Sequence, residues 1–308
     1  MDDAVQHDET MPFRSGFVTL VGRPNAGKST LINAVIGKKV AITSNTVQTT
    51  RHRFRAVLTR PGFQLVMVDT PGLHKPHDAL GEELNTSALK ALEDVDVVAM
   101  LVDASKPIGT GDEWVAEHVR SAKAKRILVI TKIDLATPEE IEKQKLAAEG
   151  LADWDGIVEV SAQTGENVEA FVGLAESFLP EGPQWFPADM DTDQSLEVII
   201  AEFIREKILR EFREEIPHAI GVATEELEYV RAKDMYRIFA IVYVERDSQK
   251  GMIIGKKGAA IKQVGTQARE DLEQLLGCKV FLDLTVKVKK NWRRDLNQIR
   301  RFGYGEGI

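Results

Sequence analysis

Apolar residues along the first 180 positions gather in short runs, and helical patterns separate these runs. Buried strands are usually about 4–8 residues long, and runs of that length fall at residues 17–21, 53–59, 64–68, 95–102, 127–130 and 157–160. Helical spacing is found at residues 30–35, 80–92, 112–122, 138–148 and 167–178. Strands that alternate with helices predict an α/β domain with a mostly parallel sheet covered by helices on both faces.

The pattern changes after residue 180. Residues 181–193 are rich in Pro, Gly and acidic side chains and lack periodicity, which predicts a linker. Beyond it we expect a helix at 194–212, strands at 219–230 and 236–244, a glycine-interrupted helical region at 253–276, a strand at 280–288 and a basic tail. These elements predict a disordered N-terminus at 1–15, a first domain at 16–180 and an α+β second domain at 194–308.

The composition indicates the size class and the cellular compartment of the protein. The chain has 308 residues, long enough for two domains, and 43% hydrophobic and 29% charged residues are ordinary for a globular protein. Its single cysteine, Cys278, excludes an internal disulfide and suits a reducing cytosol. The first ten residues carry four acids and no Lys or Arg, unlike a secretory signal, and the apolar runs are too short to cross a bilayer. We expect a cytoplasmic protein.

The net charge of −8 is unevenly distributed. Residues 1–183 carry a net charge of −8 and residues 184–245 carry −7, whereas residues 246–301 carry +8. Only this last stretch is expected to attract the phosphates of a nucleic acid.

Residues 22–29 spell a P-loop, Gly-Arg-Pro-Asn-Ala-Gly-Lys-Ser, directly between a predicted strand and a predicted helix. Backbone N–H groups of such a loop surround phosphates, and the start of the helix adds partial positive charge. We expect Lys28 to reach the β- and γ-phosphates and the Ser29 hydroxyl to bind Mg²⁺. The remaining residues expected to line the nucleotide here are Gly22, Asn25, Ala26, Gly27 and Thr30.

A second motif, Asp69-Thr70-Pro71-Gly72, closes the strand at 64–68. Asp69 is expected to hold Mg²⁺ through water, and the Gly72 N–H to sense the γ-phosphate. Leu73 follows, at the position where Ras-type enzymes carry a glutamine that orients water. A leucine cannot orient water, so the sequence predicts slow intrinsic hydrolysis.

Base selectivity is expected from Thr131-Lys132-Ile133-Asp134 at the end of another strand. A carboxylate at Asp134 accepts hydrogen bonds from N1–H and N2–H₂ of guanine, which adenine does not offer. Ser161 and Ala162, after the next strand, are expected to place a backbone N–H on the guanine O6. These motifs predict GTP rather than ATP.

In the second domain, Gly255-Lys256-Lys257-Gly258 has the GxxG form of a KH domain. The glycines permit close approach to a nucleic-acid backbone, and the two lysines are expected to meet its phosphates. Lys290 and Arg293, in the basic tail, are expected to extend this RNA-binding surface.

The four nucleotide motifs, in this order, resemble the translation-factor-like class of P-loop GTPases. That resemblance implies that Thr50, from switch I, completes the Mg²⁺ shell when the γ-phosphate is present, with Thr49 as the competing assignment. Lys28, Thr50 and Gly72 would then serve catalysis. Thr131 departs from the asparagine usual in that class, and Asn25 stands where related GTPases bind K⁺.

Joined to a KH domain, these motifs resemble the Era family of bacterial GTPases over about residues 17–301. The resemblance implies a type II KH domain and a Mg²⁺-dependent GTP-hydrolysing switch that binds the 3′ end of 16S rRNA and acts in assembly of the small (30S) ribosomal subunit. It also implies peripheral contact with the inner membrane. We expect a monomer.

The sequence disfavours two other functions. An RNA-binding scaffold with a degenerate nucleotide site is disfavoured by intact Lys28, Ser29, Asp69 and Asp134. A tRNA-modification or membrane-transport GTPase would lack a KH domain, so residues 194–301 argue against it.

Overall fold

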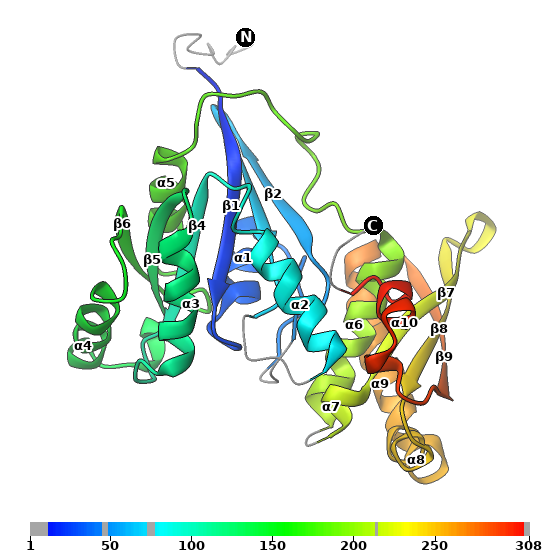
Figure 1. Cartoon of the computed structure of the whole chain (residues 1–308). Coiled ribbons are helices and arrows are strands. Elements are labelled where there is room, and N and C mark those ends of the chain that lie inside the picture. Colours follow the sequence, from blue (N-terminus) through cyan, green and yellow to red (C-terminus); the bar gives the residue numbers. More distant parts are fainter. Residues whose placement is uncertain (1–11, 45–48, 73–77, 213–214, 305–308) are drawn as a thin grey trace, which may run out of the picture.

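The computed structural model describes residues 12–44, 49–72, 78–212 and 215–304, which form two domains lying side by side (Figure 1). The first contains a six-stranded sheet in the order β2-β3-β1-β4-β5-β6. Neighbouring strands are parallel except for β2, which pairs antiparallel with β3 at one edge. The strands are β1 (Arg14–Gly22), β2 (Phe54–Arg60), β3 (Phe63–Asp69), β4 (Val97–Asp103), β5 (Lys125–Thr131) and β6 (Gly156–Val160).

Helices cover both faces of this sheet, because its central strands present apolar side chains on both faces. In β4, Val97, Ala99 and Leu101 belong to one apolar cluster, and the intervening residues belong to the cluster on the opposite face. The helices are α1 (Lys28–Ile36) and α5 (Val168–Ser177) on the first face, and α2 (Ala79–Lys90), α3 (Thr110–Ser121) and α4 (Pro138–Glu149) on the other. The predicted α/β fold is confirmed.

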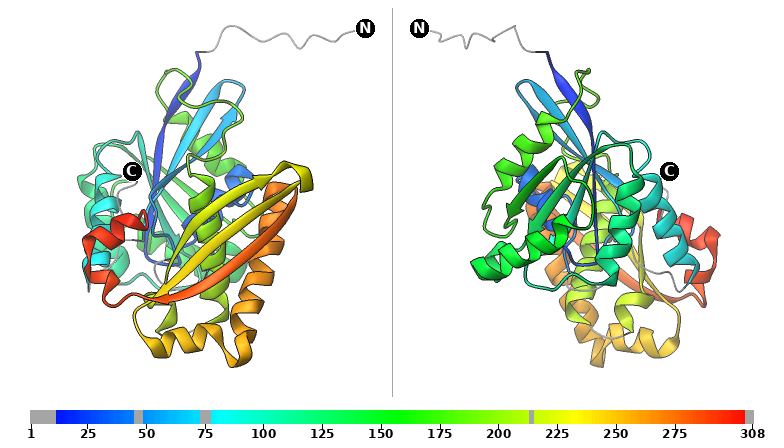
Figure 2. Two further views of the ribbon diagram at one scale, coloured as in Figure 1. Left: turned by 90° about the vertical axis from the view of Figure 1, so that its right-hand side faces the viewer. Right: turned by 60° about the vertical axis from the view of Figure 1, so that its left-hand side comes forward.

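The second domain contains a three-stranded sheet, with β8 antiparallel to β7 and parallel to β9. Helices α6 and α9 pack on one face of this sheet, and Figure 2 shows the strands in front of α6. The elements are α6 (Leu196–Glu211), α7 (Ile216–Ala219), β7 (Gly221–Val230), β8 (Met235–Val244), α8 (Asp247–Ile254), α9 (Ala259–Leu276), β9 (Lys279–Val288) and α10 (Leu296–Arg301). This is the predicted α+β arrangement of a type II KH domain.

Short 3₁₀ turns complete the described elements: η1 (Ile133–Leu135), η2 (Arg231–Lys233), η3 (Lys256–Gly258) and η4 (Trp292–Arg294). The helical region expected at 253–276 is therefore two helices joined through η3. None of the described helices has the length and apolar character needed to span a lipid bilayer.

One expectation about an irregular segment was wrong, and a second segment makes contacts that were not predicted. Residues 14 and 15, expected to be disordered, start β1, because Arg14 pairs with Phe63 along β3; residues 1–11 lie outside the described part of the chain. The segment predicted to be a linker, residues 181–193, contains no named helix or strand, and Gln64 attaches it to the first domain. Its side-chain carbonyl accepts hydrogen bonds from the backbone N–H groups of Trp185 (2.8 Å) and Phe186 (3.0 Å).

The basic tail is also folded, and it joins the two domains. Trp292, Ile299, Phe302 and Tyr304 are buried and form an apolar cluster with Leu80 and Leu84 of α2. Figure 1 shows α2 extending from the first domain toward α10. The tail therefore packs on the helix that follows the Asp69–Gly72 motif.

We expect Trp292→Ala to lower the free energy of unfolding by about 3–5 kcal/mol, the usual cost of truncating a buried aromatic side chain. Trp292 is 0% exposed, and its Nε1 donates to the Ala219 carbonyl at 2.9 Å. Trp185→Ala is the matched control, because Trp185 is 56% exposed. Urea unfolding followed by circular dichroism measures both changes; similar midpoints for the two variants would contradict the assigned burial.

Candidate functional site

The P-loop lies where β1 ends and α1 begins, and its backbone needs glycine at position 22. A Cβ there would lie 2.7 Å from the Leu101 carbonyl oxygen. Asn25 and Gly27 adopt positive φ angles of 64° and 100°. This conformation lets consecutive backbone N–H groups converge before the first turn of α1.

A cavity of about 430 Å³ lies beside this loop. The predicted nucleotide-site residues that line it are Asn25, Gly27, Lys28, Ser29, Thr30, Thr50, Gly72 and Lys132. Further lining residues come from elsewhere in the chain: Ile42, Thr43, Ser44, Gln163 and Arg210. Motif analysis missed this second group, of which Arg210 belongs to α6 of the second domain.

Lys28 is buried at the base of the cavity, with its Nζ 3.5 Å from the Gly22 carbonyl oxygen. Burial lowers the pKa of this ammonium, and the carboxylate of Asp69 partly opposes the shift. A Cβ at Gly72 would come within 3.3 Å of both Lys28 Nζ and the Pro24 backbone. A side chain at position 72 would therefore be crowded, because the backbone there lies close to the P-loop.

Three oxygen-bearing side chains converge next to Lys28. The Ser29 and Thr50 hydroxyl oxygens lie 3.0 Å apart, and each donates to Asp69 Oδ2, at 3.3 Å and 3.1 Å respectively. Burial raises the pKa of Asp69 to about 6, and its Oδ1 has no hydrogen-bond partner among the described residues. A buried carboxylate and two hydroxyls are ligands that suit Mg²⁺, so these residues fit the ion.

The two threonines of switch I (residues 49–52) have different surroundings. Thr50 is buried and faces Ser29 and Asp69, whereas the Thr49 hydroxyl lies 2.7 Å from that of Ser44. Of the two, Thr50 is the one placed to approach a cation in the pocket.

Asp134 and Ser161, predicted to read guanine, lie together. The Ser161 hydroxyl donates to Asp134 Oδ1 at 2.6 Å, so the buried serine fixes the exposed carboxylate. Lys132 adopts a positive φ of 59°, and its Nζ pairs with Asp103 at 2.7 Å. Ala162 follows Ser161 and packs on the core of the first domain.

Thr131, predicted to lie in the nucleotide site, makes hydrogen bonds within the protein. Its side chain is 4% exposed, and its hydroxyl lies within hydrogen-bonding distance of the carbonyls of Ala26 (2.7 Å) and Val102 (3.1 Å). The hydroxyl therefore connects the P-loop to β4 rather than reaching the cavity.

The two middle residues of the Asp69–Gly72 motif make contacts within the first domain. Thr70 and Pro71 are buried, and the Thr70 hydroxyl donates to the Leu20 carbonyl at 3.2 Å. Leu73 lies outside the described residues.

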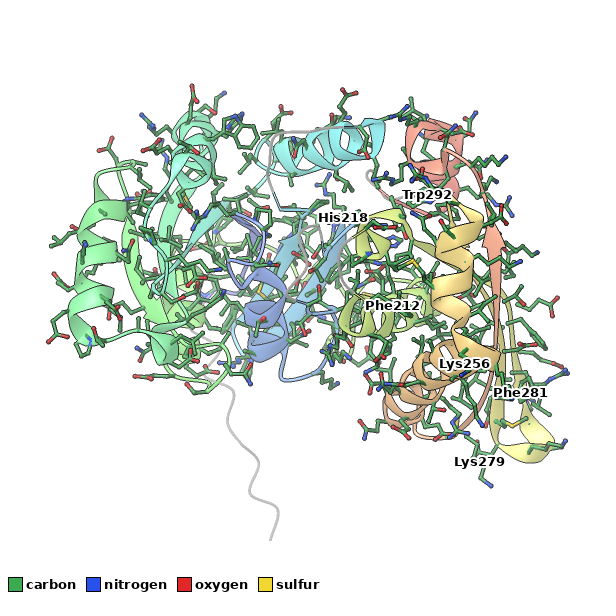
Figure 3. All side chains as sticks on the ribbon, turned by 90° about the horizontal axis from the view of Figure 1, so that it is seen from below. Phe212, His218, Lys256, Lys279, Phe281 and Trp292 are labelled. Atoms are coloured by element: carbon green, nitrogen blue, oxygen red, sulfur yellow. The ribbon has the colours of Figure 1, made fainter. Side chains whose placement is uncertain are left out.

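The GxxG motif forms the turn between α8 and α9. Gly255 has a φ of 71°, and a Cβ there would lie 2.7 Å from that of Ala260. Lys256 and Lys257 are exposed, and Figure 3 shows Lys256 well separated from Trp292. A neighbouring groove of about 250 Å³ between α9 and β9 is lined by Ile261, Lys262, Gly265, Thr266, Arg269, Leu282 and Leu284.

The two tail residues predicted to bind RNA differ. Lys290 is exposed, but Arg293 is half-buried and forms ion pairs with Asp78 (3.2 Å) and Glu245 (3.0 Å). Arg293 thus connects the KH domain to the residue just before α2, and an RNA contact by it stays a prediction.

The fold and the site define a P-loop GTPase fused to a C-terminal KH domain. The family model described as 50S ribosome-binding GTPase matches residues 17–132, and the KH domain model matches residues 215–293.

Full-length relatives narrow this class. The chain is 46% identical to GTPase Era of Mycolicibacterium smegmatis, over 95% of this chain and 99% of the relative. It also matches the crystal structure of a variant of Aquifex aeolicus Era bound to GDP.AlF4−, and that of Era in complex with MgGDPNP and nucleotides 1506–1542 of 16S ribosomal RNA. Each match has 36% identity and a TM-score of 0.92, and covers 96% of this chain and 100% of the other. The chain belongs to the Era family of GTPases, as its motifs indicated, and it binds guanine nucleotides with Mg²⁺.

We expect Asp134→Asn to shift nucleotide preference from GTP to XTP, because an amide nitrogen donates where the carboxylate accepts. Two hydrogen bonds to a charged group contribute about 3–6 kcal/mol, so GTP affinity should fall by at least about 100-fold. Equilibrium titration with fluorescent GTP and XTP measures the change, and Asp153→Asn, an exposed site on the same domain, is the control. Unchanged GTP affinity would remove Asp134 from the base pocket.

Proposed function

We propose that this GTPase is a switch that binds the 3′ region of 16S rRNA through its KH domain and acts in assembly of the small ribosomal subunit. The observation that carries the RNA assignment is the pair of exposed lysines, Lys256 and Lys257, at a tight glycine turn beside a groove. The Era relative crystallised with nucleotides 1506–1542 of 16S rRNA, which has the same fold over nearly the whole chain, supports the choice of RNA.

The groove suits single-stranded RNA. Its floor contains the apolar side chains of Ile261, Leu282 and Leu284, while Lys262 and Arg269 are exposed at its margin. KH domains hold a few unpaired nucleotides by clamping the backbone at the GxxG loop and accommodating bases beside it. Lys290 extends the basic surface. The domain that binds the RNA is proposed to span residues 194–308.

The nucleotide site supports specific roles for its residues. Ser29, Thr50 and Asp69 would hold Mg²⁺, which neutralises charge on the β- and γ-phosphates when it is bound. The Lys28 ammonium would contact the same phosphates, and the Gly72 N–H would approach the γ-phosphate. Asp134, held by Ser161, would select guanine, and the leucine at position 73 would leave intrinsic hydrolysis slow.

Asn25 supports a second cation, K⁺, next to the phosphates. It has a left-handed backbone conformation in the P-loop and lines the cavity, so an oxygen of its side chain can face the nucleotide. A monovalent cation at this place would add positive charge near the transferring phosphoryl group.

The cellular location and the oligomeric state of the protein are inferred from the family resemblance. We infer a monomer in the cytoplasm with peripheral contact to the inner membrane. The free Cys278 is consistent with a reducing compartment.

We expect the double substitution Lys256→Asp and Lys257→Asp to weaken binding to a single-stranded 16S rRNA 3′-end fragment by at least about tenfold, because two attractions to phosphate become repulsions. Losing two phosphate contacts should flatten the slope of log K against log salt concentration by roughly 1.4, about 0.7 per contact. Fluorescence anisotropy at several salt concentrations measures both quantities.

The control for this test is Lys123→Asp with Lys143→Asp, which changes the net charge equally on exposed positions of the first domain. The same affinity and salt slope in the Lys256/Lys257 variant as in the unmodified protein would show that the GxxG loop is not the RNA site.

For the monovalent site, we expect hydrolysis to slow when K⁺ is replaced by Na⁺ at constant ionic strength, and Asn25→Ala to abolish this difference. The reason is that Na⁺ is smaller and more strongly hydrated than K⁺, so it would fit a K⁺ site less well. Phosphate release in the two salts measures the effect; equal rates for the unmodified protein would rule out the K⁺ site.

A further inference from the structure

Switch I lies between the nucleotide cavity and the KH domain, and a buried arginine of the KH domain contacts it. Arg205, in α6, is 0% exposed. Its Nη2 donates a hydrogen bond to the backbone carbonyl of Thr49. The same guanidinium is held by Glu202, through Nε (2.8 Å) and Nη2 (2.7 Å). The carboxylate of one α6 residue thus orients the arginine that reaches switch I.

A second arginine fixes switch I on the other side of Thr50. Arg51 is 1% exposed, and its guanidinium donates to the carbonyls of Ile220 (2.5 Å) and Pro217 (3.0 Å) in the KH domain. The guanidinium carbon lies 5.4 Å from the centre of the Tyr304 ring. The residues before and after Thr50 are therefore both attached to the KH domain.

Thr50 itself faces the first domain. Its hydroxyl lies 3.0 Å from that of Ser29 and donates to Asp69 at 3.1 Å. Hydrogen bonds at positions 49 and 51 restrict the backbone dihedrals that determine where this hydroxyl points. A side chain that completes a cation shell must be held within about 0.5 Å of its working position, which requires supporting contacts of this kind.

We propose that Arg205 is a positioning residue for Thr50, so that the docked KH domain completes the site that distinguishes GTP from GDP. The proposal rests on the assignment of Thr50 to the Mg²⁺ shell made above. Thr50 is needed only when the γ-phosphate is present, whereas the P-loop binds the phosphates of either nucleotide. Arg205 should therefore contribute to affinity for GTP and not to affinity for GDP.

The chemistry of the cluster explains why an arginine occupies this position. A guanidinium has several N–H groups in a fixed plane, so it binds a carboxylate and a carbonyl simultaneously. Glu202 also lies 3.4 Å from His52 Nε2. Burial by itself would raise the pKa of the Glu202 carboxyl, but the charge of Arg205 and the nearby His52 outweigh burial and lower that pKa. Burial and the charge of Arg205 lower the pKa of Arg51 to about 10, which leaves it protonated at neutral pH.

The test measures equilibrium affinities of the full chain for a non-hydrolysable GTP analogue and for GDP, with a fluorescent nucleotide and Mg²⁺. For Arg205→Gln we expect affinity for the analogue to fall about tenfold, the effect of losing a hydrogen bond from a charged donor. Affinity for GDP should change by less than about twofold, which is within the range of surface substitutions. In Arg205→Gln, the Mg²⁺ concentration that gives half-maximal binding of the nucleotide should rise for the GTP analogue but not for GDP.

The matched control is Lys39→Gln. Lys39 also connects the domains, through ion pairs with Glu206 (2.6 Å) and Asp271 (2.8 Å), but neither of these ion pairs involves residues 49–52. We expect Lys39→Gln to leave the analogue-to-GDP affinity ratio unchanged. A fall in that ratio equal to that of Arg205→Gln would show that general loosening of the interface, rather than Arg205, is responsible.

Two further variants keep the test decisive. Because Arg205→Gln leaves Glu202 buried without its partner, the pair Glu202→Gln with Arg205→Met tests the same lost contact in a neutral cluster and should give the same selective loss. An equal loss for both nucleotides, or no loss for either, would overturn the positioning role. Thr50→Ala separates the two claims: an unchanged affinity ratio in Thr50→Ala would overturn the Mg²⁺ assignment itself, whereas a changed ratio there with none in the arginine variants would overturn only the positioning by Arg205.

Discussion

The ion pair between Arg205 and Glu202 is buried where the two domains meet, and its guanidinium connects α6 of the KH domain to switch I. Removing a guanidinium and a carboxylate from water costs several kcal/mol, which their attraction offsets only when further hydrogen bonds are made. Here the carbonyl of Thr49 provides such a bond. The second buried guanidinium, Arg51, donates to the carbonyls of Pro217 and Ile220. These hydrogen bonds form only when switch I lies against α6 and α7.

A separate contact attaches the other side of the nucleotide site to the KH domain. Helix α2 follows the Asp69–Gly72 motif, and Leu80 and Leu84 pack with Trp292 and Tyr304 of the C-terminal segment. The ion pair of Arg293 with Asp78, the residue that caps α2, strengthens this contact. A change in the conformation of switch I or of the Asp69–Gly72 motif would therefore alter contacts with the KH domain. Such contacts offer a physical route by which GTP hydrolysis can affect RNA binding.

Local motifs predicted much of this site, and long-range contacts account for what they missed. The P-loop, Asp134 and the GxxG turn depend on residues adjacent in sequence, so they could be recognised without a structure. Arg205 lies on a helix whose other positions are mostly apolar, and its contact with Thr49 spans 156 positions of the chain. The packing of the tail was missed because its buried aromatic residues, Trp292, Phe302 and Tyr304, flank the six-residue helix α10 and form no helical or strand period. The contacts of Thr131 could not be predicted because its partners are backbone carbonyls far away in the sequence.

The central claim is that docking of the KH domain and completion of the GTP site are one event. A thermodynamic cycle tests it most directly: the affinity of the full chain for a 16S rRNA 3′-end fragment is measured with GDP and with a non-hydrolysable GTP analogue, and the affinity for each nucleotide is measured with and without the RNA. The account predicts that RNA affinity differs between the two nucleotides by at least about fivefold, and that the RNA alters the analogue-to-GDP preference by the same factor, as linkage requires. A ratio of one on both sides of the cycle would contradict it.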